Sequence, residues 1–198
     1  MSNNEKNNKD KNSIVDLKIV LLGATEVGKT ALIHRFINDS YPEEYDATIE
    51  EKYNVEDYKF DGINCRLQIL DTSGDEDYQN MLDTYIEFTN CYLLIYSINN
   101  ENSFKEVKTK YERICQVKEK EKENIIIVLV GNKCDLPINE RKVSTNEAEE
   151  YANKNGMKFL ESSALNRINT KEVFNIAIKK FLEKNKDKED NEGWCPCF

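Results

Sequence analysis

Long apolar runs are missing from this 198-residue sequence, since none approaches the roughly 20 residues that a membrane-spanning helix needs. Residues 1–13 are rich in asparagine and lysine and lack the apolar centre of a secretory signal peptide, so we expect a disordered leader there. An excess of positive charge is also missing, because the formal net charge is −9. A broad nucleic-acid-binding surface is therefore not expected, and any phosphate must be held locally by a loop.

Histidine is nearly absent, and no nucleophile pattern accompanies the single one, His34. We therefore expect a surface residue there and not a general base. Cysteines are spread along the chain, and four of the six lie in apolar or strand-like surroundings: Cys65, Cys91, Cys115 and Cys134. This placement favours buried free thiols in a reducing cytosol over disulfides.

Strand-like and helix-like segments alternate along the chain, which predicts an α/β fold with a mainly parallel sheet. Asp61-Gly62 is a hairpin signal between two strand-like segments and predicts the one antiparallel pair. Residues 125–130 form the most apolar run and are predicted to be the central strand. The other predicted strands are 17–22, 49–60, 63–70, 91–98 and 158–161, and the predicted helices are 29–38, 81–88, 99–122, 144–155 and one that begins at Asn169 or Thr170.

Residues 23–30, Gly-Ala-Thr-Glu-Val-Gly-Lys-Thr, fit the pattern G-x-x-x-x-G-K-[ST] between a buried strand and a helix. Gly23 and Gly28 let the backbone curl so that successive N–H groups meet phosphate oxygens at the positive end of the helix. Lys29 would reach the β- and γ-phosphates, and the Thr30 hydroxyl would ligate Mg²⁺. The pattern fixes only four positions, so a chance match is the alternative until the motifs downstream are considered.

Three further motifs follow predicted strands, where an open parallel sheet places its ligand crevice. Residues 71–74, Asp-Thr-Ser-Gly, supply a carboxylate beside the metal and a backbone N–H for a γ-phosphate. Residues 132–135, Asn-Lys-Cys-Asp, end in a carboxylate that accepts from the N1–H and 2-amino group of guanine, whereas adenine has no such pair of donors. Ser163-Ala164 offers loop amides for the guanine carbonyl. All four motifs in this order are not expected by chance.

With these motifs the chain resembles the small GTPases of the Ras type over residues 16–184, supported further by residues 45–51 and 161–164. The resemblance implies a P-loop NTPase fold with a six-stranded, mostly parallel sheet, one antiparallel edge hairpin strand and about five flanking helices. It implies a signalling switch that is on with GTP and off with GDP, with Mg²⁺ as cofactor. Residues 14–184 would form the GTP-binding domain and 185–198 a flexible tail.

The resemblance assigns roles within this domain. Thr48 would contact Mg²⁺ and the γ-phosphate, Gly74 would contact the γ-phosphate from the second switch, and Tyr41 would stack on guanine. The predicted GTP contacts are Gly23, Ala24, Thr25, Glu26, Val27, Gly28, Lys29, Thr30, Ala31, Tyr41, Thr48, Asp71, Gly74, Asn132, Lys133, Asp135, Ser163, Ala164 and Leu165. Thr30 and Thr48 would coordinate Mg²⁺ directly, and Asp71 would contact these ligands and not the metal itself. The predicted catalytic residues are Asp75, Lys29 and Thr48.

Partners follow from the same resemblance. The strand after Thr48 would be an exposed edge, to which effectors of the family often add a strand of their own. The predicted effector surface is Tyr45, Asp46, Ala47, Thr48, Ile49, Glu50, Glu51, Lys52 and Tyr53, together with the second switch. A nucleotide exchange factor and a GTPase activator are also implied, no nucleic acid is expected, and the family expectation is a monomer.

Four residues depart from the family pattern. Asp75 stands where the family has a glutamine that orients the attacking water, and its acceptor-only side chain cannot donate to a γ-phosphate oxygen. Thr25 replaces a glycine and would crowd an incoming arginine finger, so weak hydrolysis and poor stimulation by an activator are predicted. The alternative is that Asp75 is a tolerated variant or that another residue positions the water. Glu26, also in place of a glycine, would weaken nucleotide binding if it pointed inward and change nothing if it pointed to solvent; Leu165 replaces a lysine and can still cover the base.

The sequence ends in Cys195-Pro196-Cys197-Phe198, which fits C-a-a-X with a geranylgeranyl preference for Cys195. A Cys-x-Cys ending also resembles the double-prenyl ending of another branch, and Pro196 is not a typical aliphatic residue. No polybasic patch accompanies the motif, so modest membrane residence is predicted. The expected location is the cytoplasmic face of a membrane, the plasma membrane in the first place, and the cytosol before modification.

Three functions compete at this point. The first is a GTP-hydrolysing switch, and the second is a module that holds GTP and recruits effectors with negligible turnover, as Asp75 and Thr25 would favour. The third is an ATP-dependent phosphotransferase, against which Asp135 and the absence of an arginine-rich lid segment argue.

Overall fold

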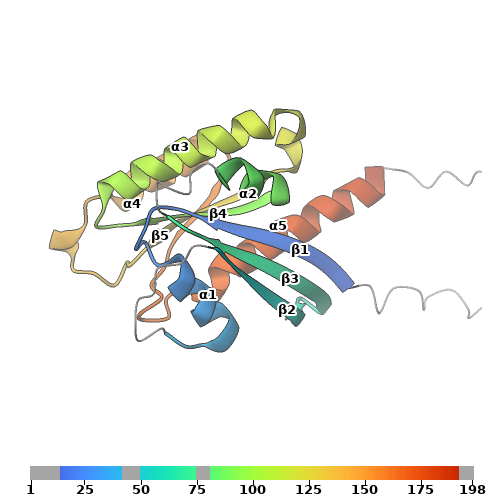
Figure 1. The fold of residues 1–198 in the computed structure, drawn as a ribbon, viewed down its shortest axis with the longest axis horizontal. Coiled ribbons are helices and arrows are strands. Elements are labelled where there is room, and N and C mark those ends of the chain that lie inside the picture. The colour runs from blue at the N-terminus through green and yellow to red at the C-terminus, as the bar shows by residue number, and fades with distance from the viewer. Residues whose placement is uncertain (1–13, 42–49, 75–80, 192–198) are drawn as a thin grey trace, which may run out of the picture.

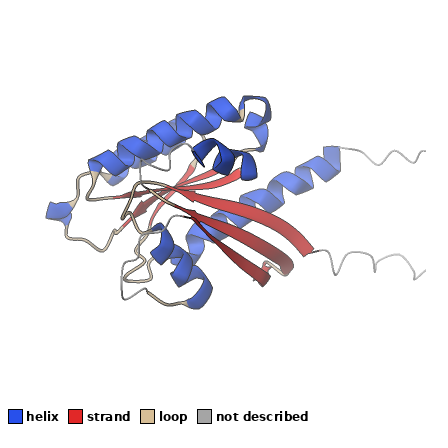
Figure 2. Ribbon diagram, in the orientation of Figure 1, coloured by secondary structure: helices blue, strands red, loops and turns tan. Residues whose placement is uncertain are grey.

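A computed structural model describes residues 14–41, 50–74 and 81–191. Within these ranges six strands form one sheet in the order β2-β3-β1-β4-β5-β6, and helices cover both of its faces (Figures 1 and 2). The elements are β1 (Ile14–Leu22), α1 (Lys29–Asn38), β2 (Glu50–Phe60), β3 (Ile63–Thr72), α2 (Leu82–Phe88), β4 (Cys91–Ser97), α3 (Glu101–Val117), β5 (Ile126–Asn132), α4 (Thr145–Lys154), β6 (Lys158–Glu161) and α5 (Thr170–Asn191), with short 3₁₀ helices at Glu119–Asn124 and Ile138–Glu140. The predicted six-stranded α/β fold is confirmed.

The hairpin is where the sequence predicts it. β2 and β3 are antiparallel, while β1 pairs in parallel with β3 and β4, β4 with β5, and β5 with β6. Asp61 and Gly62, which connect β2 to β3, have φ values of +47° and +81°. Positive φ at both central residues is what a tight two-residue hairpin turn requires, so the aspartate–glycine signal is read correctly.

The core lies in two layers, one on each face of the sheet. Leu67 and Ile69 of β3 pack in the layer covered by α1 and α5, whereas Leu70 packs in the layer covered by α2, α3 and α4. Every residue of β4 and β5 is buried, because these parallel strands have helices on both faces. The sheet therefore forms a rigid support, and the loops after its strands can hold a site.

The prediction that residues 125–130 form the central strand is wrong. β1 and β4 are the two central strands, and β5 lies next to the edge strand β6. Any interior strand with helices on both faces is buried along its length, so an apolar run shows burial and not position in the sheet.

Helix α3 is shorter than the predicted 99–122. It begins after Asn100, whose side chain accepts a hydrogen bond from Ser103 N at 3.1 Å, and it ends at Val117. The apolar stripe of the helix also ends at Val117, and the lysine–glutamate run that follows forms a short 3₁₀ helix.

Helix α5 is longer than expected and continues to Asn191. Residues 185–191, which the sequence analysis assigns to a flexible tail, are therefore helical. No proline or glycine lies between Thr170, where α5 begins, and Gly193, and lysine and glutamate are good helix formers. Residues 1–13 and 192–198, the predicted leader and the remainder of the predicted tail, lie outside the described residues.

The signals that begin and end α4 are confirmed. Ser144 caps α4 by accepting from Glu147 N at 3.1 Å, and Gly156 follows the helix with φ +67°. The four described cysteines are free thiols, Cys65 and Cys91 buried and the other two half-buried. His34 is half-buried, with Nε2 3.4 Å from the Tyr53 hydroxyl. No helix within the described ranges is long and apolar enough to cross a membrane.

Candidate functional site

The loop between β1 and α1 is held in shape by its apolar residues and one glycine. Ala24, Val27 and Ala31 are buried in the core layer under α1. Gly28 precedes α1 with φ +94°, and a Cβ there would clash with the Asn132 side chain. Only glycine meets both requirements at low cost, so the sequence motif is explained by backbone conformation and close packing.

Lys29 lies across this loop and is almost completely buried. Its Nζ donates to the carbonyls of Ala24 at 2.8 Å and Gly23 at 3.2 Å. Burial lowers the pKa of Lys29 to about 8, against the opposing attraction of Asp71. A buried ammonium whose hydrogen bonds go to neutral carbonyls forms stronger, charge-assisted hydrogen bonds when an anion binds beside it. Lys29 is therefore placed to bind a phosphate.

Asp71 and Thr30 form the other polar element beside the loop. The Thr30 hydroxyl donates to Asp71 Oδ2 at 2.6 Å, whereas the buried Oδ1 has no hydrogen-bond partner among the described residues. Burial raises the pKa of Asp71, opposed by the Thr30 hydrogen bond and by Lys29. An orphaned carboxylate oxygen beside a hydroxyl fits Mg²⁺, which takes one or two protein oxygens together with phosphates and waters. The described residues contain no cluster of three or more acidic, histidine or cysteine side chains, so the remaining ligands would come from the nucleotide and water.

Gly74 lies directly against this loop. A Cβ at Gly74 would clash with the backbone of Ala24 and Thr25. The segment after β3 therefore reaches the loop by backbone contact, as a backbone N–H aimed at a γ-phosphate requires. The Thr25 and Glu26 side chains are exposed, so the structure favours the outward alternative for Glu26. We call residues 23–30 with Asp71 and Gly74 the phosphate half of the site.

Asn132 joins the phosphate loop to the loops after β5 and β6. Its Nδ2 donates to Val27 O at 2.8 Å, and its Oδ1 accepts from Ser162 Oγ at 3.1 Å. Cys134 N also donates to Ser162 O at 3.0 Å. We call residues 132–135 and 161–165 the base half of the site. Asn132 thus positions the two halves relative to each other.

The loop after β6 is fixed to α1 by Arg35. This buried guanidinium donates to Ala164 O at 2.7 Å, to Leu165 O at 3.2 Å and to Asp39 O at 2.8 Å. It also lies 5.5 Å from the ring of Tyr41, which is exposed. Tyr41, predicted to stack on guanine, and Leu165, predicted to cover the base, are therefore both in contact with the same arginine.

The backbone of the same loop is partly used within the loop itself. Ser163 N donates to Ile168 O at 3.0 Å, and Ser163 Oγ accepts from Asn166 N at 2.9 Å. The Ser163 N–H is therefore already used within the loop, and of the two amides predicted to meet the guanine carbonyl only that of Ala164 remains a candidate. Lys133, with φ +66°, and Asp135 are half-buried in the neighbouring loop.

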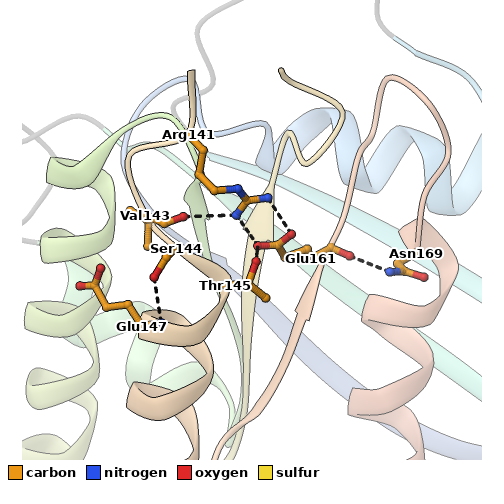
Figure 3. Close-up of polar contacts among 7 residues, drawn as sticks. All are labelled: Arg141, Val143, Ser144, Thr145, Glu147, Glu161 and Asn169. Carbon is orange, nitrogen blue, oxygen red and sulfur yellow. Dashed lines mark hydrogen bonds and ion pairs between the residues drawn. The ribbon is translucent and has the colours of Figure 1, made fainter. Parts of the chain in front are cut away.

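Glu161, the first residue of the loop segment 161–165 of the base half, is held by several polar contacts, which Figure 3 shows. Arg141 donates to both of its carboxylate oxygens, at 2.6 and 2.9 Å, and Thr145 Oγ1 donates to one of them at 3.0 Å. The Glu161 carbonyl accepts from Asn169 Nδ2 at 2.7 Å. These contacts connect the start of α4, the end of β6 and the start of α5, and they define where the loop after β6 begins.

Several predicted site residues lie outside the described residues. These are Thr48, Asp75, the first part of the effector surface (Tyr45, Asp46, Ala47 and Ile49) and the lipidation site Cys195. The described part of the effector surface, residues 50–53, begins β2, which is an edge strand of the sheet.

Three positioning residues, Arg35, Arg141 and Ser162, are not predicted from the sequence. Their partners are far away in the chain, and Arg35 and Ala164 are 129 positions apart. No local spacing identifies such pairs. Ser162 lies within residues 161–164, which support the family resemblance. Its position directly after a predicted strand was the one local signal that could have indicated its role.

Comparison with known proteins agrees with this geometry. The family model described as Ras family matches residues 18–183. The chain is similar to the Ras-like protein rasB of Dictyostelium discoideum, with 39% identity over 182 residues that cover 90% of each chain. The chain therefore belongs to the Ras family of small GTPases, GTP hydrolases that act as molecular switches and bind GTP or GDP with Mg²⁺.

Proposed function

We propose that this chain is a GTP/GDP switch whose intrinsic hydrolysis is slow. The observation that carries the nucleotide part is the pair of buried charged groups in the phosphate half. Lys29 is buried against carbonyls of its own loop, and Asp71 Oδ1 has no hydrogen-bond partner within the part of the chain that the structure describes. Bound Mg²⁺ would neutralise phosphate charge as the γ-phosphoryl group is transferred. Lys29 would hold the phosphates, while Thr30 and Asp71 would hold the metal.

Base selection in this proposal belongs to Asp135, as an acceptor for the donor edge of guanine. The nucleotide that co-purifies with the protein tests this directly, and GDP or GTP is expected. Asp135→Asn is expected to shift the preference from guanine to xanthine nucleotides, because the amide donates where the carboxylate accepts. Co-purified ATP or ADP, or equal affinity for guanine and adenine nucleotides, would contradict the proposal and favour the phosphotransferase.

Slow hydrolysis is proposed from Asp75 and Thr25. Thr25 is exposed and its backbone lies against Gly74, so its side chain is at the outer surface of the phosphate loop where an activator would approach. Single-turnover hydrolysis of wild type and Asp75→Gln, each with and without Thr25→Gly, tests the two residues separately. A faster rate in Asp75→Gln, by about 10-fold or more, is expected from restored positioning of water. An unchanged rate would show that Asp75 is not the cause.

The second candidate is a module that holds GTP and recruits effectors with negligible turnover. The exposed Thr25 favours it over a fast hydrolase. Predominantly GTP in the purified protein, unchanged after hours at 25 °C, would select this function, and GDP would select the switch.

Partner binding is proposed at the edge strand β2 and the second switch. Glu50, Glu51 and Lys52 are exposed on this strand, which leaves its outer edge open to a strand from an effector. We also include an exchange factor, an activator and membrane contact through a prenylated Cys195. Mass spectrometry of the protein from eukaryotic cells tests the modification, with Cys195→Ser as the control.

A further inference from the structure

A hollow lies at the end of the sheet opposite to the nucleotide site. Its volume is about 410 Å³, and its lining includes Tyr111 and Cys115 of α3, Ile125 just before β5, Ile127 of β5, Met157 after α4, and Lys184 of α5. This volume is within the range of small-ligand pockets, about 300–1,000 Å³. The lining lies at the amino ends of the parallel strands, whereas the phosphate loop follows the carboxyl end of β1. The hollow is therefore separate from the site described above.

The walls of this hollow suit an aromatic side chain. Tyr111 offers a ring, Cys115 and Met157 offer sulfur, and the two isoleucines add apolar surface. Sulfur atoms and aromatic rings make favourable contacts with another ring. A Cβ at Gly156, in the turn that borders the hollow, would meet no atom within 4 Å, so this side is open.

Helix α5 brings the end of the chain to the same place. Lys184 lines the hollow and its Nζ donates to Ile125 O at 3.0 Å, which fixes this part of α5 against the start of β5. The helix continues seven residues further, to Asn191, and in Figure 1 its last turns extend past the ends of the neighbouring strands. Seven helical residues rise about 10 Å.

Residues 192–198, Glu-Gly-Trp-Cys-Pro-Cys-Phe, follow directly. Trp194 lies three residues beyond Asn191, and three residues in extended conformation span at most about 11 Å, which is close to the rise of about 10 Å from Lys184 to Asn191. Gly193 permits the reversal of direction that this path needs. Trp194 is the single tryptophan of the chain and the first apolar side chain to follow the long charged stretch after Leu182.

We propose that the hollow beside Cys115 is an intrachain docking site for the C-terminal segment 192–198, with the Trp194 indole as its occupant. Docking folds the segment back along α5 and holds the neighbouring Cys195 against the protein. The docked state competes with insertion of Trp194 into a membrane interface. The hollow thus restrains the end of the chain until a membrane or a binding protein releases it.

Trp194 provides the measurement, because it is the only tryptophan and its fluorescence reports its surroundings. In the full-length unmodified protein, Cys115→Arg is expected to shift Trp194 emission to longer wavelength and to raise acrylamide quenching about twofold. The effect is modest because ordering the segment offsets much of the gain from burial. Thr109→Arg, an exposed position on the same helix, is the matched control and should match wild type. Equal emission and quenching in wild type and Cys115→Arg would overturn the proposal.

A second measurement does not depend on the folding of Cys115→Arg. The rate at which iodoacetamide alkylates Cys115, followed by peptide mass spectrometry, should rise about threefold in full-length Trp194→Ser, because the docked indole shields the thiol. Alkylation of Cys134, which lies at the nucleotide site, should not change. An unchanged Cys115 rate would overturn the proposal. Emission that depends on protein concentration would also overturn it, since it would show that the segment docks into a second copy.

Discussion

Among the described residues, Asp71 Oδ1 in the phosphate half has no hydrogen-bond partner and Lys29 Nζ donates only to carbonyls of its own loop, whereas the Asn132 side chain in the base half is bonded through both its nitrogen and its oxygen. The base half is further fixed by Arg35 and by the Arg141–Glu161 pair. The charged groups of the phosphate half therefore gain most from a ligand, whereas the base half is held in shape by hydrogen bonds within the protein. Substitutions in the first half should mainly affect ligand binding, and those in the second should also affect folding.

The largest effect is expected for Lys29→Met. The variant removes charge-assisted hydrogen bonds to phosphate, worth about 1.5–3 kcal/mol each, so GDP affinity should fall by about 10²–10³-fold. Titration of a fluorescent GDP analogue with Mg²⁺ measures this, with the exposed Lys171→Met as control. Loss of tenfold or less would show that Lys29 does not face the phosphates.

Asn132→Ala should instead destabilise the protein itself. Val27 O loses its donor and Ser162 Oγ its acceptor, and each buried group left unpaired costs about 1–3 kcal/mol. We expect the free energy of unfolding of nucleotide-free protein to fall by about 2–4 kcal/mol in urea titrations with EDTA. The exposed Asn146→Ala should leave it unchanged. A stability equal to that of Lys29→Met would remove the distinction between the two halves.

The pH dependence of stability sharpens the same distinction. Burial lowers the pKa of Lys29 from 10.5 to about 8 in the folded chain. Below pH 8 the ammonium is charged in both states, so its burial destabilises the fold. Between pH 8 and 10.5 the folded chain loses this proton first, and nucleotide-free wild type should gain about 1–3 kcal/mol relative to Lys29→Met. A difference that stays constant across this range in urea titrations would contradict the assignment.

The smallest effect is expected for Tyr96→Phe beneath the base half. The Tyr96 hydroxyl is buried in β4 without a partner among the described residues. Its removal should raise the free energy of unfolding by about 1 kcal/mol. Tyr92→Phe in the same strand is the matched control and should lower it, because the Tyr92 hydroxyl donates to Ile86 O at 2.6 Å. Destabilisation by both variants would show that the Tyr96 hydroxyl is satisfied in solution.

Sequence analysis performs well where the chemistry is local. The motif 23–30 requires a left-handed glycine and a lysine at fixed spacing, and both appear in place at Gly28 and Lys29. The Asp61-Gly62 turn and the Ser144 cap are likewise set by neighbours in the chain. It fails where an outcome depends on distant packing, as in the position of β5 within the sheet.

The sequence by itself determined the succession of strands and helices along the chain, the phosphate loop and the three further motifs, because backbone conformation and hydrophobic period act over a few residues. Tertiary structure alone decided that Asn132 joins the two halves, that Arg35 holds the loop after β6, and that a hollow lies beside Lys184 of α5. Hydrogen bonds and cavities of this kind arise between segments separated by tens of residues. Their partners are selected by how helices and strands pack, which no local spacing encodes.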